Sequence, residues 1–427
     1  MDPPLILIIV LTFAFAATHL ERAVLGGRTN LFASLEYVLI GVLVGPLGLA
    51  FLDGERLTRL EPLLAVVTGF VGFLVGLSLD LRRLKSRPRG TLPFGLVIGV
   101  VTVGLVGGLG WVALTHLPSA ALDGIPPAAV ALAAAVLGLG AIITAVESLE
   151  SGILAARADG PVSRLLPTAA QTLRVVAILG LGFALASDRA PMDAGALPVL
   201  AWDGIAITAG LGLGVIFHVF VGHETNEKKL FVATIGIVAL ASGVAHALHF
   251  STLFVNLVTG AVIANVSRAA PALLRADLRL RRPLFVVLLI LAGAGWRPLP
   301  GLLWLVPAGY LVIRAIALRL GAQVAVAVTA ADIDADTPHL GDALLGQGAL
   351  AAAVAVNYAM VSDHGALTAV VVTTLLIGAA LNDLWYAPAL RSVLQKAGES
   401  GRLAPSPEPP PPGEGHASGP TPERSGS

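Results

Sequence analysis

Two ionisable residues of this chain, Glu147 and Arg174, belong to apolar segments that are long enough to cross a bilayer. Residues 126–148 carry Glu147 at their end, and residues 165–186 carry Arg174 in their interior. A charged side chain at membrane depth is costly unless it faces a partner, a water-filled cavity or a transport path. A carboxylate in such a place can bind a proton or a cation, whereas a guanidinium stays charged and needs an anion. We therefore expect Glu147 to pair with Arg174.

The spacing around Glu147 suggests an ion site. Thr144 precedes it by three residues, so both side chains can face one side of a helix. If the helix breaks near Ala145, Glu147 can turn into a cavity while Thr144 and freed carbonyls coordinate an ion. The alternative is that Glu147 and Glu150 are cytoplasmic loop residues. The pair itself also allows two mechanisms: Arg174 replaces a bound cation when the site is empty, or it locks the helices permanently.

The composition is that of a membrane protein. Of the 427 residues, 56% are hydrophobic and only 13% are charged, whereas a soluble domain has about a quarter of its residues charged. The net charge is zero, so nothing indicates nucleic acid. The chain has no cysteine, which excludes disulfides and thiolate sites. Because it also lacks a nucleophile–base or metal-ligand constellation, we expect no enzyme, no metal site and no cofactor.

Apolar runs of suitable length predict about thirteen spanning helices, or twelve if one short run is re-entrant. The runs are residues 4–19, 33–52, 62–80, 92–115, 127–147, 164–186, 203–221, 229–248, 251–266, 283–297, 301–326, 341–361 and 366–388. The predicted fold class is therefore an all-α polytopic membrane protein.

Charge in the connecting loops predicts the orientation. Lys and Arg concentrate in alternate loops, beginning with the loop after the first helix, and cytoplasmic loops carry this excess. The N-terminus is thus expected outside and the C-terminus in the cytoplasm, in an inner membrane. Residues 1–390 form the predicted transmembrane domain. Residues 391–427, rich in Pro, Gly, Ser and Glu, form a predicted disordered cytoplasmic tail.

Two pairs of segments resemble each other. Residues 70–76 (FVGFLVG) align with 285–291 (FVVLLIL), and residues 39–43 (LIGVL) align with 258–262 (VTGAV). Both alignments pair helices separated by the same odd number of helices. Copies with such an offset must cross the membrane in opposite directions.

The alignments therefore predict two inverted repeats of six helices, residues 1–186 and 229–390, joined by a connector helix at 203–221. This offset also pairs segments 127–147 and 341–361, which both contain several glycines. Glycine-interrupted helices in corresponding positions are typical of an ion site at the membrane midplane, so we expect both to be discontinuous and to cross. The alternative is that these glycines only permit close helix packing.

Several motifs occur in the order found in a known family. They are residues 36–46 (EYVLIGVLVGP), 73–80 (FLVGLSLD), 254–265 (FVNLVTGAVIAN) and 344–354 (LLGQGALAAAV). Together they resemble the monovalent cation:proton antiporter superfamily, which includes the sodium/hydrogen exchangers and the glutathione-regulated potassium efflux group. The resemblance extends over nearly the whole membrane region.

The resemblance implies an ion-carrying core domain, a dimerisation domain and elevator-like alternating access. It places the ion site on the fifth and sixth predicted helices, residues 127–147 and 164–186, where Thr144 and Gln171 match the family's motifs. In the sixth helix, Thr172 stands where the family has its ion-binding aspartate. In the twelfth helix, residues 341–361, Ala349 stands where the family has a glutamate. The resemblance also implies that Arg314 is the basic residue that crosses to an acid and stabilises the core.

These observations predict a secondary active transporter that exchanges Na⁺ or K⁺ for protons, acts in the lipid bilayer and forms a homodimer. Thr172 cannot replace an aspartate in this exchange, because a hydroxyl does not titrate at physiological pH. Two alternatives therefore stay open. The protein could keep the fold as a non-transporting or repurposed membrane protein, or it could transport an anionic solute, since Arg174 lacks the usual aspartate.

Overall fold

The computed structural model describes residues 33–82, 90–188, 199–224, 226–267, 270–329, 339–362 and 364–402. These residues form helices and connecting segments and contain no strand. The prediction of an all-α protein is confirmed. The first predicted span, residues 4–19, lies outside the described residues.

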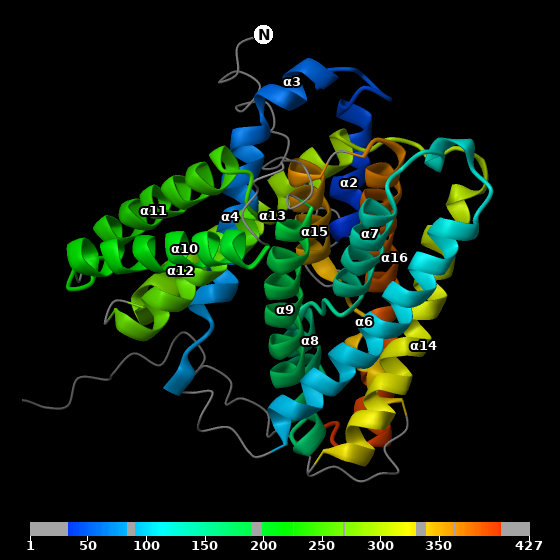
Figure 1. The fold of residues 1–427 in the computed structure, drawn as a ribbon. Coiled ribbons are helices and arrows are strands. Elements are labelled where there is room, and N and C mark those ends of the chain that lie inside the picture. The colour runs from blue at the N-terminus through cyan, green and yellow to red at the C-terminus, as the bar shows by residue number, and fades with distance from the viewer. Residues whose placement is uncertain are drawn as a thin grey trace, which may run out of the picture.

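The helices follow one another along the chain with short connections (Figure 1). They are α2 (Ala33–Val44), α3 (Gly54–Arg59), α4 (Glu61–Leu77), α6 (Thr91–His116), α7 (Pro127–Ala141), α8 (Val146–Ala155), α9 (Pro161–Ser187), α10 (Val199–Val221), α11 (Glu227–Ala247), α12 (Thr252–Val266), α13 (Ala270–Ala294), α14 (Leu305–Val328), α15 (Gly348–Val361) and α16 (Ala366–Lys396), with the 3₁₀ helices η1 (Ala120–Leu122), η2 (Gly301–Trp304) and η3 (Leu340–Leu344).

Many of these helices have the length and hydropathy of membrane-spanning segments. Within the described residues, six spans are long and apolar enough to cross a membrane, or seven if the bent helix α16 counts as one. Shorter apolar helices add Leu35–Val44, Glu61–Leu77, Thr252–Val266 and Gly348–Val361. The protein is thus a multi-pass membrane protein, and the exact count of thirteen spans stays a prediction.

The helices form two groups (Figure 1). Helices α10, α11 and α12 lie on one side together with α4, and α6 and α14 pack against each other on the opposite side. The broken helices and α9 lie between these groups. Apolar side chains of α4, α10, α11 and α12 form a second, smaller hydrophobic core beside the main one, and α4 and α12 contribute side chains to both.

Glycines allow the closest helix contacts. Gly72 and Gly76 of α4 face the backbone of α12, where an added Cβ would overlap the carbonyl oxygens of Leu253 and Leu257. Gly41 of α2 lies in the same way against Ile290 of α13. In lipid such close backbone approach is a main source of helix association.

The packing partners support the predicted repeat. The repeat pairs α2 with α12, and α4 with α13. In the structure α2 packs against α13, and α4 packs against α12. A two-fold axis that relates the two copies places α2 on α12 and α13 on α4. The contact between α2 and α13 is therefore equivalent to the contact between α12 and α4. The inverted repeat itself stays a prediction.

The α4–α12 contact provides a stability prediction. We expect Gly72→Ala to lower the free energy of unfolding by roughly 1–3 kcal/mol, since the methyl group forces two packed backbones apart. The control is Gly104→Ala in α6, where an added Cβ meets nothing within 4 Å; it should stabilise the protein by about 0.5–1 kcal/mol. Denaturation of both variants in mixed micelles measures the difference. Equal effects of the two substitutions would contradict the close-packing role.

The end of α16 corrects the predicted tail boundary. Residues 391–396 continue the helix, and Val393 and Leu394 are buried. Beyond the helix, the Glu399 carboxylate is 1% exposed and accepts hydrogen bonds from the backbone N–H groups of Val162 and Ser163 at 2.7 and 2.8 Å. It thereby caps the N-terminus of α9, where a negative charge is favourable. The tail predicted from residue 391 starts too early, because residues 391–396 still belong to α16 and Glu399 is buried against α9.

Candidate functional site

Two discontinuous helices meet at the centre of the protein, as the sequence predicted. The first breaks between α7 and α8, and the second breaks between η3 and α15. A hydrogen bond from the Ala145 N–H to the Gly346 carbonyl, at 2.9 Å, joins the two interrupted segments. Thr144 donates its hydroxyl to the Leu344 carbonyl at 3.1 Å and is fully buried. Gly348 begins α15 at a φ of +64°, a conformation that favours glycine.

Arg314 of α14 holds both breaks together. Its guanidinium is 0% exposed and donates to the carbonyl oxygens of Ala141 at 2.8 Å and Ile143 at 2.9 Å. It also donates to Leu345 at 2.6 Å and Leu344 at 3.3 Å. These carbonyls lie at the C-terminal ends of α7 and η3, which carry partial negative charge. Arg314 therefore stabilises the crossing by satisfying carbonyls that have no helical partner.

Gln347 is a second support that the sequence reasoning missed. Its side-chain amide donates to the Gly140 carbonyl and to the Tyr310 hydroxyl, both at 2.7 Å. Its side-chain carbonyl accepts a hydrogen bond from Asn382 at 3.1 Å. A polar residue between Gly346 and Gly348, within an apolar run, was the signal that could have identified it.

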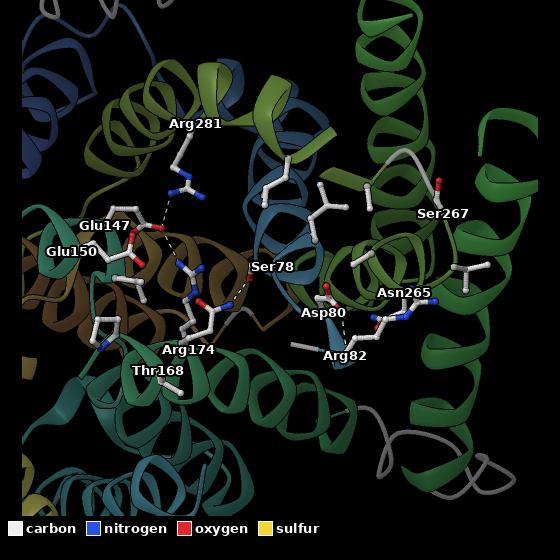
Figure 2. A pocket seen from close by; sticks show the side chains of 18 residues that line it. Ser78, Asp80, Arg82, Glu147, Glu150, Thr168, Arg174, Asn265, Ser267 and Arg281 are labelled. Carbon is white, nitrogen blue, oxygen red and sulfur yellow. Dashed lines mark hydrogen bonds and ion pairs between the residues drawn. The ribbon is translucent and has the colours of Figure 1, made fainter. Parts of the chain in front are cut away.

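A cavity of about 660 Å³ leads from the surface toward the crossing. It lies between α4, α12 and α13 on one side and α8 and α9 on the other (Figure 2). The ionisable residues in its wall are equally divided between acids and bases: Asp80, Glu147, Glu150, Arg82, Arg174 and Arg281. The cavity is therefore polar and wide enough for a hydrated ion or a small organic molecule.

Glu147 sits at the inner end of this cavity and binds two arginines. Its Oε1 accepts hydrogen bonds from Arg174 at 2.8 Å and from Arg281 at 2.7 Å. Figure 2 shows both guanidinium groups pointing toward this carboxylate. The side chains of Arg174, Arg281 and Glu147 are 8, 17 and 38% exposed. Two cations at this distance favour the charged form of the carboxylate.

The predicted contact between Glu147 and Arg174 is thus present, and both glutamates lie in α8 rather than in a loop. Arg281 was missed as a site residue, because the basic stretch before residue 283 was assigned to a cytoplasmic loop. Helix α13 instead begins at Ala270 and carries Arg281 into the cavity wall.

The remaining sequence candidates divide into two groups. Gln171 lines the cavity and donates a hydrogen bond to the Ser78 hydroxyl. Thr144 lines a deeper, smaller cavity of about 30 Å³ together with Arg174 and Arg281. Thr172 lines neither cavity; its hydroxyl donates to the Thr168 carbonyl at 2.9 Å, and it lies on the side of α9 that faces Gly95 of α6. The structure brings together Thr144, Glu147, Gln171 and Arg174 around the cavities, and it does not place Thr172 with them.

At its other end, α12 is joined to α15 by buried hydrogen bonds. Asn357 of α15 accepts hydrogen bonds from the Thr252 hydroxyl at 2.9 Å and the Leu253 N–H at 3.3 Å, and it donates to the Ser251 hydroxyl at 3.0 Å. Asn357, Ser251 and Thr252 are all buried. These bonds tie the start of α12 to α15, whereas the end of α12 lines the open cavity.

No family model and no curated protein matches the sequence. Many solved structures match the fold. One is the sodium proton antiporter MjNhaP1 from Methanocaldococcus jannaschii at pH 8, with a TM-score of 0.65 and 14% identity over 91% of this chain and 98% of that chain. The chain has the fold of a sodium proton antiporter. An electron microscopy structure of the same antiporter matches with a TM-score of 0.57 and 16% identity, over 95% of this chain and 100% of that chain.

This antiporter fold agrees with the fold that the sequence resemblance implied. At these identities the likeness establishes the fold alone. The residues inside the cavity therefore have to be interpreted from their own chemistry.

Proposed function

We propose that this protein is a proton-coupled secondary active transporter that works by alternating access. The observation that carries the proposal is the cavity that ends at Glu147, directly beside two crossed, discontinuous helices. Unwound backbone at such a crossing supplies dipoles in the middle of a membrane, and irregular backbone is tolerated there because it lines a cavity. A carboxylate at this position can couple the binding of a proton to the binding of a cargo.

The two ends of the helix groups differ in a way that supports alternating access. The cavity reaches Glu147 from one end, and at the other end the buried bonds of Asn357 hold α15 against the start of α12. Exchange between two such states requires the Asn357 bonds to break as the cavity closes. The predicted orientation makes the open end cytoplasmic, with the N-terminus outside and the C-terminus inside an inner membrane. The inverted repeats and a homodimer belong to the same proposal.

The sequence predicts Na⁺ or K⁺ as the cargo. In that mechanism Glu147 binds a proton and a cation in turn, and Arg174 takes the place of the cation when the site is empty. The cation must then displace two guanidinium groups from Glu147. If the ion pairs are permanent instead, the protein does not transport, which is the alternative that the sequence left open. No enzymatic activity is proposed.

The test is proton exchange in vesicles that contain the purified full-length protein. An imposed pH gradient should collapse when Na⁺ or K⁺ is added outside, and Li⁺ completes the series. Vesicles without protein provide the control for leakage. If no solute moves protons in vesicles that contain folded protein, the transport proposal is wrong.

A further inference from the structure

The charges around the crossing do not balance. Helices α8 and α15 both begin there, and neither N-terminus has a side-chain cap. Two helix N-termini carry together about one positive charge, which the carboxylate of Glu147 in the first turn of α8 offsets. The partial negative charges at the C-terminal ends of α7 and η3 are already offset by Arg314.

Arg174 and Arg281 add two further positive charges to this balance. Of the other two acids in the cavity wall, Asp80 is matched in charge by Arg82. Glu150 is exposed and makes no hydrogen bond to Arg174 or Arg281 in the described part of the chain. Counting Glu150 in full, the inner end of the cavity keeps about one positive charge in excess. A monovalent cation bound there would increase this excess, whereas a monovalent anion bound together with one proton would leave it unchanged.

The Arg174 side chain has unused hydrogen-bonding capacity. The residue is 6% exposed and lines both the large and the small cavity. Its Nε is buried and finds no partner among the described residues. A buried donor without an acceptor is costly, so a ligand that supplies an acceptor at this point gains binding energy.

Glu147 indicates which ligand chemistry fits. Its carboxylate uses one oxygen to bind two guanidinium groups that come from different helices. The same two groups can bind the carboxylate of a solute, with Arg174 offering Nε in addition. The cavity of about 660 Å³ has room for the rest of a small molecule. Its wall combines apolar side chains such as Leu77 and Leu274 with the polar groups of Gln171 and Asn265.

We propose that the cargo is a small organic monocarboxylate, which binds to Arg174 and Arg281 and displaces Glu147. The displaced Glu147 loses both cations that favour its charged form and accepts a proton from water in the cavity. One anion and one proton therefore bind together, and the loaded site carries no additional charge across the membrane. This inference rests on the proposed transport function and specifies its cargo.

Calorimetry on the purified full-length protein tests the site, with pyruvate and benzoate as choline salts and with NaCl and KCl for comparison. Titrations in two buffers of different ionisation enthalpy report the protons taken up. We expect pyruvate or benzoate to bind with uptake of about one proton per anion. Arg174→Gln and Arg281→Gln should each weaken this binding about tenfold or more.

Arg59→Gln is the matched control. Arg59 lies on α3, pairs with Glu55 at the surface and does not line the cavity, so binding should be unchanged. Arg174→Lys should keep part of the affinity, because it keeps the charge but loses the Nε donor. Absence of binding for both carboxylates, or binding that is indifferent to Arg174→Gln, would overturn the inference.

The vesicle assay separates this inference from the proposed function. Proton-coupled flux of Na⁺ or K⁺ without carboxylate binding would contradict the anionic cargo and leave the transport proposal intact. Carboxylate binding without proton-coupled flux of any solute would contradict transport and leave the binding site intact. Proton-coupled uptake of labelled pyruvate supports both.

Discussion

Arg314→Met is expected to lower the free energy of unfolding by at least about 4 kcal/mol. The variant removes four hydrogen bonds from a charged donor to the carbonyls of Ala141, Ile143, Leu344 and Leu345. A hydrogen bond to a charged group contributes roughly 1.5–3 kcal/mol, and in a dry interior no water donates a hydrogen bond to the carbonyls left behind. Methionine fills most of the volume, so the effect reports lost hydrogen bonds rather than a cavity. Denaturation in mixed micelles gives the measurement.

Two further variants make this result interpretable. Arg319→Met lies on the same helix, but Arg319 is 47% exposed and pairs with Asp342 at 2.5 Å; it should cost less than about 1 kcal/mol. Arg314→Lys keeps the charge with fewer donors and should be intermediate. A loss for Arg314→Met no greater than that for Arg319→Met would show that the crossing does not depend on Arg314.

The fold could be predicted largely because lipid restricts the possible structures. Backbone in a membrane must satisfy its own polar groups, so apolar runs become helices with boundaries close to those of the runs. The predicted run 92–115 corresponds to α6, which spans Thr91–His116. The prediction failed where the chain leaves the bilayer. Helix α13 starts at Ala270 because Ala, Leu and Arg are strong helix formers, while the arginines lower the local hydropathy and hide this extension.

The breaks at the crossing could also be predicted, although the glycines act differently from what we expected. A Cβ on Gly138 would lie 2.9 Å from the Val103 carbonyl of α6, and one on Gly140 would overlap Leu375. These two glycines permit close packing, and the break itself depends on Arg314 and on Gly348 with its positive φ. Glycine position therefore indicated the correct helix without indicating the interaction that holds it open.

The site could be predicted only in part, because the prediction used a single signal, the energetic cost of burying a charge without a partner. Arg174 inside an apolar run required an acid, and Glu147 was the nearest one. Arg281 could not be found in this way, because a basic residue in a predicted cytoplasmic loop requires no partner. Glu147 binds both arginines because α8, α9 and α13 converge at this point. The sequence of a single segment does not contain this information.

Glu147→Gln is expected to abolish proton coupling without unfolding the protein. The amide has the size of the carboxylate and can still accept a hydrogen bond from one arginine, but it binds no proton in the physiological range. Cargo flux in vesicles should therefore stop responding to a pH gradient, and the heat of cargo binding should become the same in buffers of different ionisation enthalpy. Glu227→Gln, an exposed change in the first turn of α11, should leave both properties unchanged. Proton-driven flux that persists in Glu147→Gln would exclude Glu147 as the coupling residue.

The affinity of the same variant for its cargo identifies the charge of that cargo. If the cargo is an anion, the carboxylate of Glu147 competes with it for Arg174 and Arg281. If the cargo is a cation, the same carboxylate binds it directly. Removing its charge should therefore strengthen the binding of a monocarboxylate, on the order of tenfold, and would weaken the binding of Na⁺ or K⁺. Because the direction of the change depends on cargo charge alone, stronger pyruvate binding in Glu147→Gln supports the anion and weaker Na⁺ or K⁺ binding supports the cation. A single substitution thus tests both the coupling residue and the sign of the transported charge.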